Sequence, residues 1–599
     1  MERSVDWQVP RRRDALGFWL RTRLLSARRL LRDALRGDLR RWPVGTSWAD
    51  TPVLAQVRSP LWTDGRPEEF VLVAGKVHNL RIAARAFHAV EVPAGAVLSF
   101  WSQLGRPTAA RGFVEGREVR EGCVVPTLGG GICQISNALA DAAWRAGFEL
   151  LERHGHSARI EQASPADADR LDATVFWRHI DLRLRASHDW RIELTLSADQ
   201  LILTLRGAKP QGRPAVAIRA QHEAPPSPST TVARGCLSCE EVSCFRHRGP
   251  AQPAPSQGRT ACLLDAWTPE FASCLEAEGG DWWAPLPMRL AFWRPTARAW
   301  TANDKARLHH ARWASAARHL WQRLWSRAEG GRRQAALLAG QGLLARAYAR
   351  RLDPLHTRLV VDQTLLPHLE LLGVLAGREL VVLAPALPMD VIEARLDRAA
   401  RQWPEDGSLR DFRAPRALVE AEAKALARAS QIVTAHAEVA AVLRARFKAS
   451  VELLPWQMAP SQALASARPE GPPLLVFPSS GLARKGAREL AAALRTAPIC
   501  RLRILGRPVH LDLWQGLDVE FFQADRGANP LSGAHGLVLP AHVEHSPRLL
   551  LSGLSLGLPV IASAACGLGN PADQANLTVV PAGDIEALRE ALCRLLLRT

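Results

Sequence analysis

The sequence predicts a multidomain protein in which an α+β domain precedes a pair of α/β domains, each with a doubly wound parallel sheet. Three observations support this fold class. A chain of 599 residues is long enough for roughly three or four domains. In the first third, alternating polar and apolar segments surround one helical pattern. From about residue 259 onward, short buried strands alternate with helices, which is typical of parallel sheets.

Composition argues against several classes of protein. The hydrophobic content of 47% and charged content of 23% are ordinary for a globular protein. The formal net charge is +18, but lysine occurs at only six positions, and all the other positively charged residues are arginine. Because no basic stripe interleaved with stacking aromatic residues follows the N-terminal segment, we expect no nucleic-acid binding. No apolar run approaches about 18 residues and no secretory signal pattern is present, so we expect a cytoplasmic protein.

The N-terminal segment, residues 1–45, is strongly basic. Residues 11–41 carry eleven arginines interleaved with leucines near helical spacing, namely Leu16, Leu20, Leu24, Leu31 and Leu35. A basic amphipathic helix of this kind can lie on an anionic membrane surface. We therefore expect either a peripheral contact with the inner membrane or, as the alternative, an arginine-faced helix docked on its own domain.

The predicted first domain, residues 46–206, is organised around residues 129–136, which read GGGICQIS. Three glycines allow a tight turn and a close backbone approach. The following apolar spacing is helical, so Cys133 should lie at a helix N-terminus, which favours a thiolate. We expect Cys133 to act as a nucleophile with His156 or His154 as base and Asp172 as an orienting group. The alternative is a structural cysteine. Residues 70–73 and 172–177 read as strands.

This domain resembles the VanW family. The resemblance rests on VLSFWSQLGRPTAARGFVEG, GGGICQISNALADAAWRAGFELLERHGHS, DATVFW and DLRLRA, which occur in this order over about 140 residues. The family takes its name from glycopeptide-resistance gene clusters, and its biochemical activity is not established. The resemblance therefore implies a cell-envelope context and no particular reaction.

Residues 207–258 form a predicted proline-rich linker that carries a cluster of metal-binding residue types. Cys236, Cys239, Cys244 and His247 have the spacing C-x2-C-x4-C-x2-H. A C-x2-C turn can point both sulfurs at one ion, and a C-x2-H pair can complete a tetrahedron around zinc. An iron–sulfur cluster, or an oxidised cysteine pair without metal, is the alternative.

The remainder divides into predicted α/β domains at residues 259–470 and 471–599. In the first, residues 260–265, 358–362, 379–384 and 432–434 read as strands, and residues 303–352 read as long helices. In the second, strands are expected at 474–477, 501–505, 519–522, 536–540 and 559–562. Two such sheets that face a cleft make the GT-B arrangement, in which the ligand lies outside the strand ends.

The C-terminal domain resembles family-4-type glycosyltransferases through FPSSGLARKG, ILGRP and LVLPAHVEHSPRLLLSGLSLGLPVIAS. In these enzymes an arginine and a lysine bind the nucleotide diphosphate, and two glutamates contact the transferred sugar and the ribose. Lys485 matches the lysine and Glu544 matches the first glutamate. The arginine position holds Ser480, and the second glutamate position holds Ser552. We expect Arg484, Arg507 and Arg548, with nearby helix N-termini, to compensate in donor binding.

Three hypotheses of function follow. The first is a nucleotide-sugar-dependent, retaining glycosyltransferase that works with the VanW-like domain on a cell-envelope or surface glycan precursor, with a glycan or lipid-linked acceptor. The second is a catalytically silent protein that binds a glycan or nucleotide or serves as a scaffold, which the two missing groups favour. The third is acyl or peptidyl transfer through Cys133.

Overall fold

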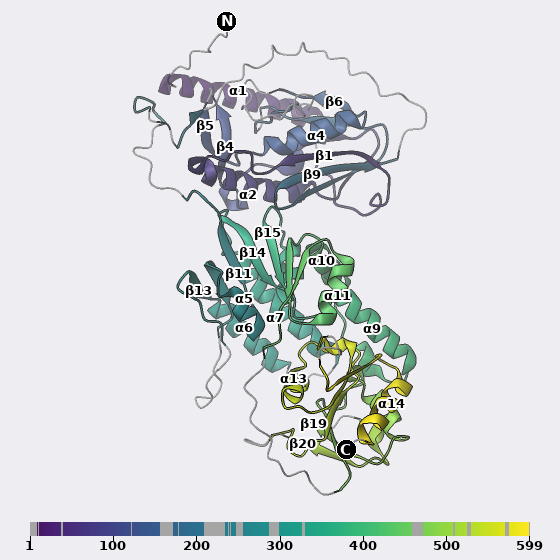
Figure 1. The fold of residues 1–599 in the computed structure, drawn as a ribbon. Coiled ribbons are helices and arrows are strands. Elements are labelled where there is room, and N and C mark those ends of the chain that lie inside the picture. The colour runs from purple at the N-terminus through teal and green to yellow at the C-terminus, as the bar shows by residue number, and fades with distance from the viewer. Residues whose placement is uncertain are drawn as a thin grey trace. The chain divides into compact units, whose positions relative to one another are not determined.

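The computed structural model describes residues 9, 11–36, 40–120, 123–155, 172–177, 179–208, 234–237, 239, 241–246, 255–286, 299–325, 330–457, 471–506, 510–523, 529–569 and 574–597. The chain divides into two compact units. Unit 1 comprises Met1–Arg259, Leu352–Arg358 and Gly373–Glu379, and unit 2 comprises Thr260–Arg351, Leu359–Leu372 and Leu380–Thr599. In Figure 1 most of unit 1 is purple to blue and unit 2 is teal to yellow, and the two short later stretches of unit 1 share the colours of unit 2. Of the helices described, none is both long and apolar enough to cross a bilayer.

Unit 1 is an α+β structure built mainly from antiparallel strands. Its largest sheet has the order β1-β9-β8-β2, and two three-stranded sheets have the orders β10-β5-β4 and β3-β7-β6. The strands are β1 (Val53–Pro60), β2 (Val90–Val92), β3 (Val97–Ser99), β4 (Glu115–Arg120), β5 (Cys123–Leu128), β6 (Glu149–Glu152), β7 (Arg183–Arg185), β8 (Trp190–Leu196), β9 (Gln200–Gly207) and β10 (Arg234–Gly235). The helices are α1 (Arg12–Arg36), α2 (Phe70–Phe87), α3 (Phe100–Leu104) and α4 (Cys133–Arg145).

Two helices of unit 1 pack on its largest sheet. Helix α4 contacts β1 and β9, and α2 contacts β8. Between them lies an apolar core that includes Leu80, Phe87, Ile135, Leu139 and Trp190, all of which are at most 1% exposed. This core fixes where α4 begins, and therefore where the glycine-rich turn before it lies.

Two predicted strands of unit 1 are wrong. Residues 70–73 begin α2, because their apolar side chains lie on a helix that is buried on most of its surface and so shows no clear period. Residues 172–177 contain no strand; Phe176 forms only an isolated bridge with Ile180. The backbone of this segment is instead bound by side chains of α4, as described below.

The first sheet of unit 2 has the order β13-β12-β11-β14-β15-β16-β17. Strand order in the chain reverses between β11 and β14, which is the switch point of a doubly wound sheet. The strands are β11 (Arg259–Leu263), β12 (Gly280–Ala284), β13 (Ala306–His310), β14 (His356–Asp362), β15 (Glu379–Leu383), β16 (Gln431–Thr434) and β17 (Ser450–Leu453). The helices are α5 (Pro269–Leu275), α6 (Arg312–Leu324), α7 (Gly331–Ala349), α8 (Leu366–Leu371), α9 (Met389–Gln402), α10 (Arg416–Leu426) and α11 (Ala437–Arg446).

The second sheet of unit 2 is parallel throughout, with the order β20-β19-β18-β21-β22-β23. Its strands are β18 (Leu474–Phe477), β19 (Arg501–Leu505), β20 (Val519–Phe522), β21 (Gly536–Leu539), β22 (Val560–Ser563) and β23 (Leu577–Val580), and its helices are α12 (Ala487–Leu494), α13 (Arg548–Ser555) and α14 (Ile585–Leu596). We call the described residues of unit 2 up to 457 its N-terminal half and residues 471–597 its C-terminal half. The predicted fold class, an α+β domain followed by two doubly wound sheets, is confirmed.

Candidate functional site

The central feature of the C-terminal half is an ion pair between two residues expected from the sequence. Lys485 lies in a short 3-10 turn (Ala483–Lys485) after β18, and Glu544 lies between β21 and α13. Strands β18 and β21 are neighbours at the switch point of this sheet, where ligands bind beyond the strand ends. The Lys485 Nζ atom lies 2.9 Å from Glu544 Oε2 and also donates to the carbonyl oxygen of Val543 at 2.9 Å.

The Glu544 carboxylate is partly buried and held in one orientation. Its side chain is 13% exposed, and its Oε1 atom accepts backbone hydrogen bonds from His545 at 2.9 Å and Ser546 at 2.8 Å. Burial by itself would raise the pKa of Glu544. The charge of Lys485 and the bonds from Ser546 and Lys485 outweigh burial, so that the pKa lies below its ordinary value. Glu544 is therefore ionised at neutral pH and fixed in position.

A histidine from the N-terminal half of unit 2 completes this arrangement. His436, the residue that caps α11, places Nε2 2.8 Å from the carbonyl oxygen of Glu544. Its Nδ1 atom accepts a hydrogen bond from Val439 N at 3.3 Å, so Nε2 carries the hydrogen and donates. Burial is the main cause that lowers the pKa of His436, which keeps the ring neutral. Sequence reasoning missed this residue, because 108 residues separate it from Glu544 and no motif connects them.

The three predicted donor-binding arginines have different surroundings. The Arg484 guanidinium lies 5.6 Å from the centre of the Phe412 ring. Burial and the nearby Arg333 lower its pKa, while Glu544 and Asp411 act in the opposite direction. Arg484 is thus close enough to Glu544 for the charge of that carboxylate to act on the Arg484 pKa. Arg507 lies outside the residues described. A Cβ atom on Gly506, the residue before it, would lie 3.4 Å from Ser480 Cβ.

Arg548 bonds to the other half of unit 2. Its NH1 and NH2 atoms each lie 2.7 Å from an oxygen of Glu270, whose side chain is fully buried, and its guanidinium lies 5.1 Å from the Trp456 ring centre. Ser552, at the expected ribose-binding position, donates to the carbonyl oxygen of Arg548 at 3.0 Å. Arg548 is thus engaged by Glu270 within unit 2.

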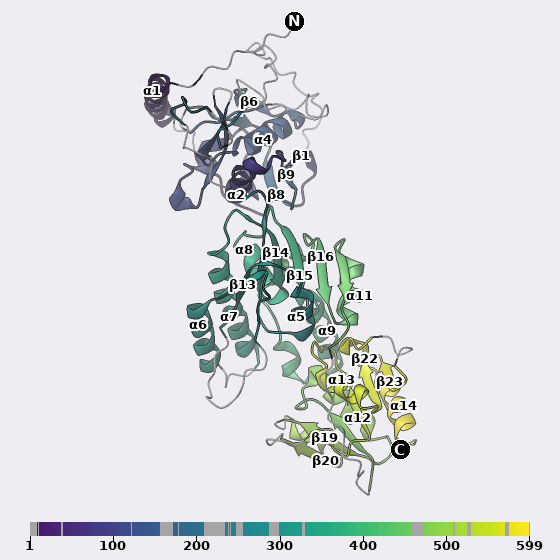
Figure 2. The same ribbon diagram turned by 60° about the vertical axis from the view of Figure 1, so that its left-hand side comes forward.

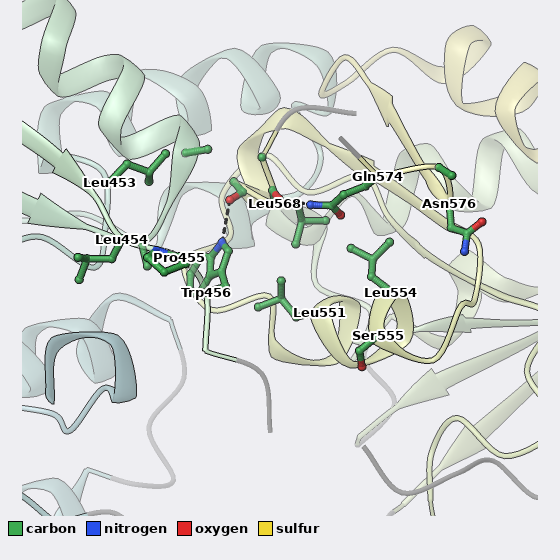
Figure 3. Close-up of a pocket in the computed structure, with 15 residues that line it drawn as sticks. Leu453, Leu454, Pro455, Trp456, Leu551, Leu554, Ser555, Leu568, Gln574 and Asn576 are labelled. Carbon is green, nitrogen blue, oxygen red and sulfur yellow. Dashed lines mark hydrogen bonds between the residues drawn. The ribbon is translucent and has the colours of Figure 1, made fainter. Parts of the chain in front are cut away.

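An apolar pocket of 520 Å³ lies between the two halves of unit 2, as Figure 3 shows. Its walls include Leu454, Trp456, Leu551, Leu554 and Leu568. Two of its polar donors bond to backbone: Trp456 Nε1 donates to Gly567 O at 3.1 Å, and Gln574 Nε2 donates to Leu568 O at 3.0 Å. Since its described lining contains no lysine or arginine, the pocket suits an apolar part of a ligand rather than a phosphate.

In unit 1, the glycine-rich turn and Cys133 lie where the sequence predicts them. Gly129 and Gly131 have φ values of 77° and 93°, and Cys133 is the first residue of α4. A Cβ atom on Gly130 would lie 2.4 Å from the backbone of Gly116, and one on Gly131 would lie 2.1 Å from Lys76 Cγ. The turn thus needs glycine both for its conformation and for close approach.

The side chains of the GGGICQISN stretch bind the backbone of residues 173–175. The Cys133 thiol lies 3.6 Å from Val175 O and 3.8 Å from Thr174 Oγ1. Ser136 Oγ donates to Ala173 O at 2.6 Å, and Asn137 Oδ1 accepts from Ala173 N at 2.9 Å. Two of the motifs noted in the sequence are therefore joined, with the thiol as one of the links.

The predicted catalytic partners of Cys133, His154 and Asp172, have contacts of their own. The His154 ring is 47% exposed and lies 3.7 Å from Glu152 Oε1, while its carbonyl oxygen accepts from Thr174 N at 2.7 Å. The carbonyl oxygen of Asp172 accepts from Arg153 at 2.8 Å. His156 lies outside the residues described. The contacts of the thiol described above therefore support the structural alternative for Cys133.

Strand β10 brings the cysteine cluster beside β5. Arg234 pairs with Cys123, and Cys236 N donates to Val124 O at 2.9 Å. Burial, followed by the fields of Cys123, Cys244 and Cys239, raises the pKa of Cys236, so Cys123 is a fourth thiol in this neighbourhood. Over the described ranges, no three His, Cys, Asp or Glu side chains are arranged to hold a metal ion, and His247 lies outside those ranges.

Two stretches of the chain match known protein families. Residues 75–206 match the family described as VanW like protein, and residues 472–598 match the family described as glycosyl transferases group 1. The chain is 26% identical over 137 residues to the vancomycin B-type resistance protein VanW of Enterococcus faecalis, covering 22% of this chain and 50% of that protein. It is 30% identical over 112 residues to the uncharacterized protein YoaR of Bacillus subtilis, covering 19% of this chain and 36% of that protein. The chain thus covers at most half the length of these relatives.

Among solved structures, the chain is similar to a sucrose-phosphate synthase from Thermosynechococcus elongatus, with a TM-score of 0.39, 16% identity, and coverage of 57% of this chain and 90% of that one. It is also similar to WaaG, a glycosyltransferase involved in lipopolysaccharide biosynthesis, with a TM-score of 0.35, 16% identity, and coverage of 56% and 90%. By the family matches, the chain contains a VanW domain at residues 75–206 and a group 1 glycosyltransferase domain at residues 472–598.

Proposed function

We propose that unit 2 is a retaining glycosyltransferase that transfers a sugar from a nucleotide-sugar donor. The observation that carries this proposal is the partly buried Lys485–Glu544 pair beyond the strand ends of the second sheet. When a donor binds, Lys485 and Arg484 neutralise the diphosphate in place of a metal ion, and Glu544 contacts the transferred sugar. The anomeric carbon exchanges its bond to the diphosphate for a bond to an acceptor hydroxyl.

The acceptor that we propose is a glycan or lipid-linked precursor of the cell envelope or cell surface, reached from the cytoplasmic side of the inner membrane. The VanW domain in the same chain and the similarity to VanW of Enterococcus faecalis, a resistance protein, support this context. Helix α1 supports a peripheral membrane contact, since Leu16, Leu24 and Leu31 are 59%, 73% and 66% exposed. Arg29 in α1 binds Glu152 of the VanW domain through both NH groups, so this part of the helix is held against that domain.

Titration calorimetry with UDP, GDP and ADP tests the donor proposal. We expect one of them to bind with a dissociation constant below millimolar, and Lys485→Met to weaken that binding by about tenfold or more because a charge-assisted contact is lost. Arg416→Met is a matched control, since Arg416 is 92% exposed in the same unit. No heat with any nucleotide at millimolar concentration would remove the enzyme proposal.

The alternative, a catalytically silent binding or scaffold protein, is favoured by two observations. Ser480 and Ser552 replace two diagnostic groups, and Arg548 is bound to Glu270 instead of being directed to a donor. A silent protein would bind nucleotide or glycan without turnover of any nucleotide sugar. Acyl or peptidyl transfer through Cys133 remains a third proposal, and an iodoacetamide rate for Cys133 that follows an ordinary thiol pKa would count against it.

We also retain the zinc proposal for Cys236, Cys239, Cys244 and His247. The proximity of Cys123, Cys239 and Cys244 to Cys236 supports a sulfur-rich site of the kind that zinc occupies. Metal analysis of the purified chain and of Cys239→Ser tests it. Equal zinc content in the two proteins would contradict this ligand set, and iron with acid-labile sulfide would favour the cluster alternative.

A further inference from the structure

Helix α6 in the N-terminal half of unit 2 carries an apolar face that is directed outward. Trp313 is 90% exposed, Leu320 is 61% exposed and Leu324 is 68% exposed, and Trp321 is 39% exposed. Positions 313, 320 and 324 are spaced so that they share one side of a helix. We call Trp313, Leu320, Trp321 and Leu324 the α6 face. Isolated exposed apolar residues are common, but several large ones on one side of a helix mark an interaction surface.

The opposite side of α6 is bonded to the rest of unit 2, so the helix is held in place with the α6 face outward. Ser315 Oγ accepts a hydrogen bond from Leu286 N at 2.9 Å, and Arg318 forms an ion pair with the buried Asp265. Figure 2 shows α6 at the outer edge of the N-terminal half, beside α7. The inner side of α6 is therefore occupied, and the α6 face remains directed to solvent.

The charges of α6 indicate what covers this face. Between Arg312 and Leu324 the helix contains three arginines and no aspartate or glutamate. Arg312 and Arg323 are exposed at its two ends. Tryptophan and leucine on one side, with arginine at the flanks, is the composition of helices that lie in the headgroup region of an anionic bilayer. A helix of 13 residues is about 20 Å long, which suits a contact lying in the plane of the membrane.

We infer that the α6 face docks unit 2 on an anionic lipid bilayer. Trp313 and the two leucines enter the boundary between headgroups and acyl chains, and Arg312 and Arg323 lie among anionic headgroups.

Vesicle co-sedimentation of the full chain tests the inference. We expect binding to vesicles of phosphatidylglycerol and phosphatidylcholine, weak binding to phosphatidylcholine alone, and a decline with added salt. Leu320→Glu should lower the partition coefficient at least about tenfold. Leu371→Glu is the matched control, because Leu371 is a 54% exposed leucine on α8 of the same unit. Quenching of tryptophan fluorescence by brominated lipid should fall in Trp313→Phe.

Other outcomes would overturn the inference. If Leu24→Glu in α1 abolishes vesicle binding and Leu320→Glu changes nothing, the N-terminal helix alone makes the contact. If sedimentation velocity shows a dimer that Leu320→Glu dissociates, without vesicle binding, the occupant is a second copy of the chain. Nucleotide titration is a separate readout, so failure of the donor proposal and failure of membrane docking are distinguishable.

Discussion

Substitution of Gly131 by alanine tests how the glycine-rich turn is built. Gly131 has φ of 93°, where a side chain is strained, and a Cβ atom would lie 2.1 Å from Lys76 Cγ. Lys76 is itself only 6% exposed, so it has little room to move. The left-handed conformation costs about 1–2 kcal/mol for a residue other than glycine. Overpacking adds about 1–3 kcal/mol. We therefore expect Gly131→Ala to destabilise unit 1 by about 2–5 kcal/mol.

Two other glycines separate these contributions. Gly147, directly after α4, has φ of 75°, and no atom of the described residues lies within 4 Å of the Cβ that alanine would add. Gly147→Ala should therefore lower the free energy of unfolding only through the left-handed conformation, by about 1–2 kcal/mol. Gly130 has no positive φ, but its Cβ would lie 2.4 Å from the backbone of Gly116. Gly130→Ala should therefore cost about 1–3 kcal/mol through packing alone.

Hydrogen–deuterium exchange of α4 peptides measures all three variants with one reporter, because the glycines flank this helix on both sides. The free energy of opening should fall least for Gly147→Ala and most for Gly131→Ala. Equal losses for Gly131→Ala and Gly147→Ala would refute the steric part of the reasoning. A neutral Gly130→Ala would show that the contact with Gly116 relaxes easily.

Further predictions concern the remaining contacts. In the folded protein the pKa of Glu544 lies below its ordinary 4.5. The ionised carboxylate therefore stabilises the fold above pH 4.5, and this stabilisation is lost as the pH falls through the lowered pKa. Thermal melts of Glu544→Gln should not show this loss of stability in acid. Arg548→Ala should lower the stability of unit 2 by about 3 kcal/mol, because it leaves the buried Glu270 unpaired. Adding Glu270→Gln to this variant should restore part of the lost stability, as measured by urea unfolding. Cys133→Ser should keep the α4 exchange rates within about threefold, since a hydroxyl also donates to Val175 O, whereas Cys133→Ala should raise them; the reverse order would contradict the structural role of the thiol.

The C-terminal half of unit 2 is the part that its sequence predicts most fully, for a physical reason. Its strands are short, buried and separated by helices with an apolar side, and β18, β19, β20 and β21 fall within a residue of the expected positions. Strand β13, by contrast, lies within a stretch whose composition predicts helix. It lies at a sheet edge, where its residues alternate between exposed and half-buried and are mostly arginine, histidine and alanine. An edge strand needs no apolar run, so composition alone does not reveal it.

Helix α2 shows the opposite difficulty. Residues 70–73 resemble a strand because they are consecutive apolar residues, yet they form the first turn of a helix that is buried on most sides. A helix with no solvated face loses the period that distinguishes it from a buried strand. Residues 172–177 depart from the expected strand for another reason. Their backbone groups bond to Cys133, Ser136 and Asn137, so side chains distant in the sequence provide the partners that a neighbouring strand would provide.

The candidate site shows the same division between local and distant information. Lys485 and Glu544 could be predicted because each lies in a recognisable motif, and both are positioned by the loops of one sheet. Three further residues come from the N-terminal half of unit 2. His436 bonds to Glu544, Glu270 pairs with Arg548, and Phe412 contacts Arg484. These contacts depend on how the two halves pack, which the sequence motifs do not reveal.

Arg484 and Arg548, two of the arginines expected to replace the missing donor contacts, are therefore already engaged within unit 2. A donor must either displace Arg484 from Phe412 and Arg548 from Glu270 or bind with Lys485 as its main cation. Nucleotide affinities of Arg484→Met and Arg548→Met separate these two cases, since a spectator arginine changes neither affinity nor its salt dependence.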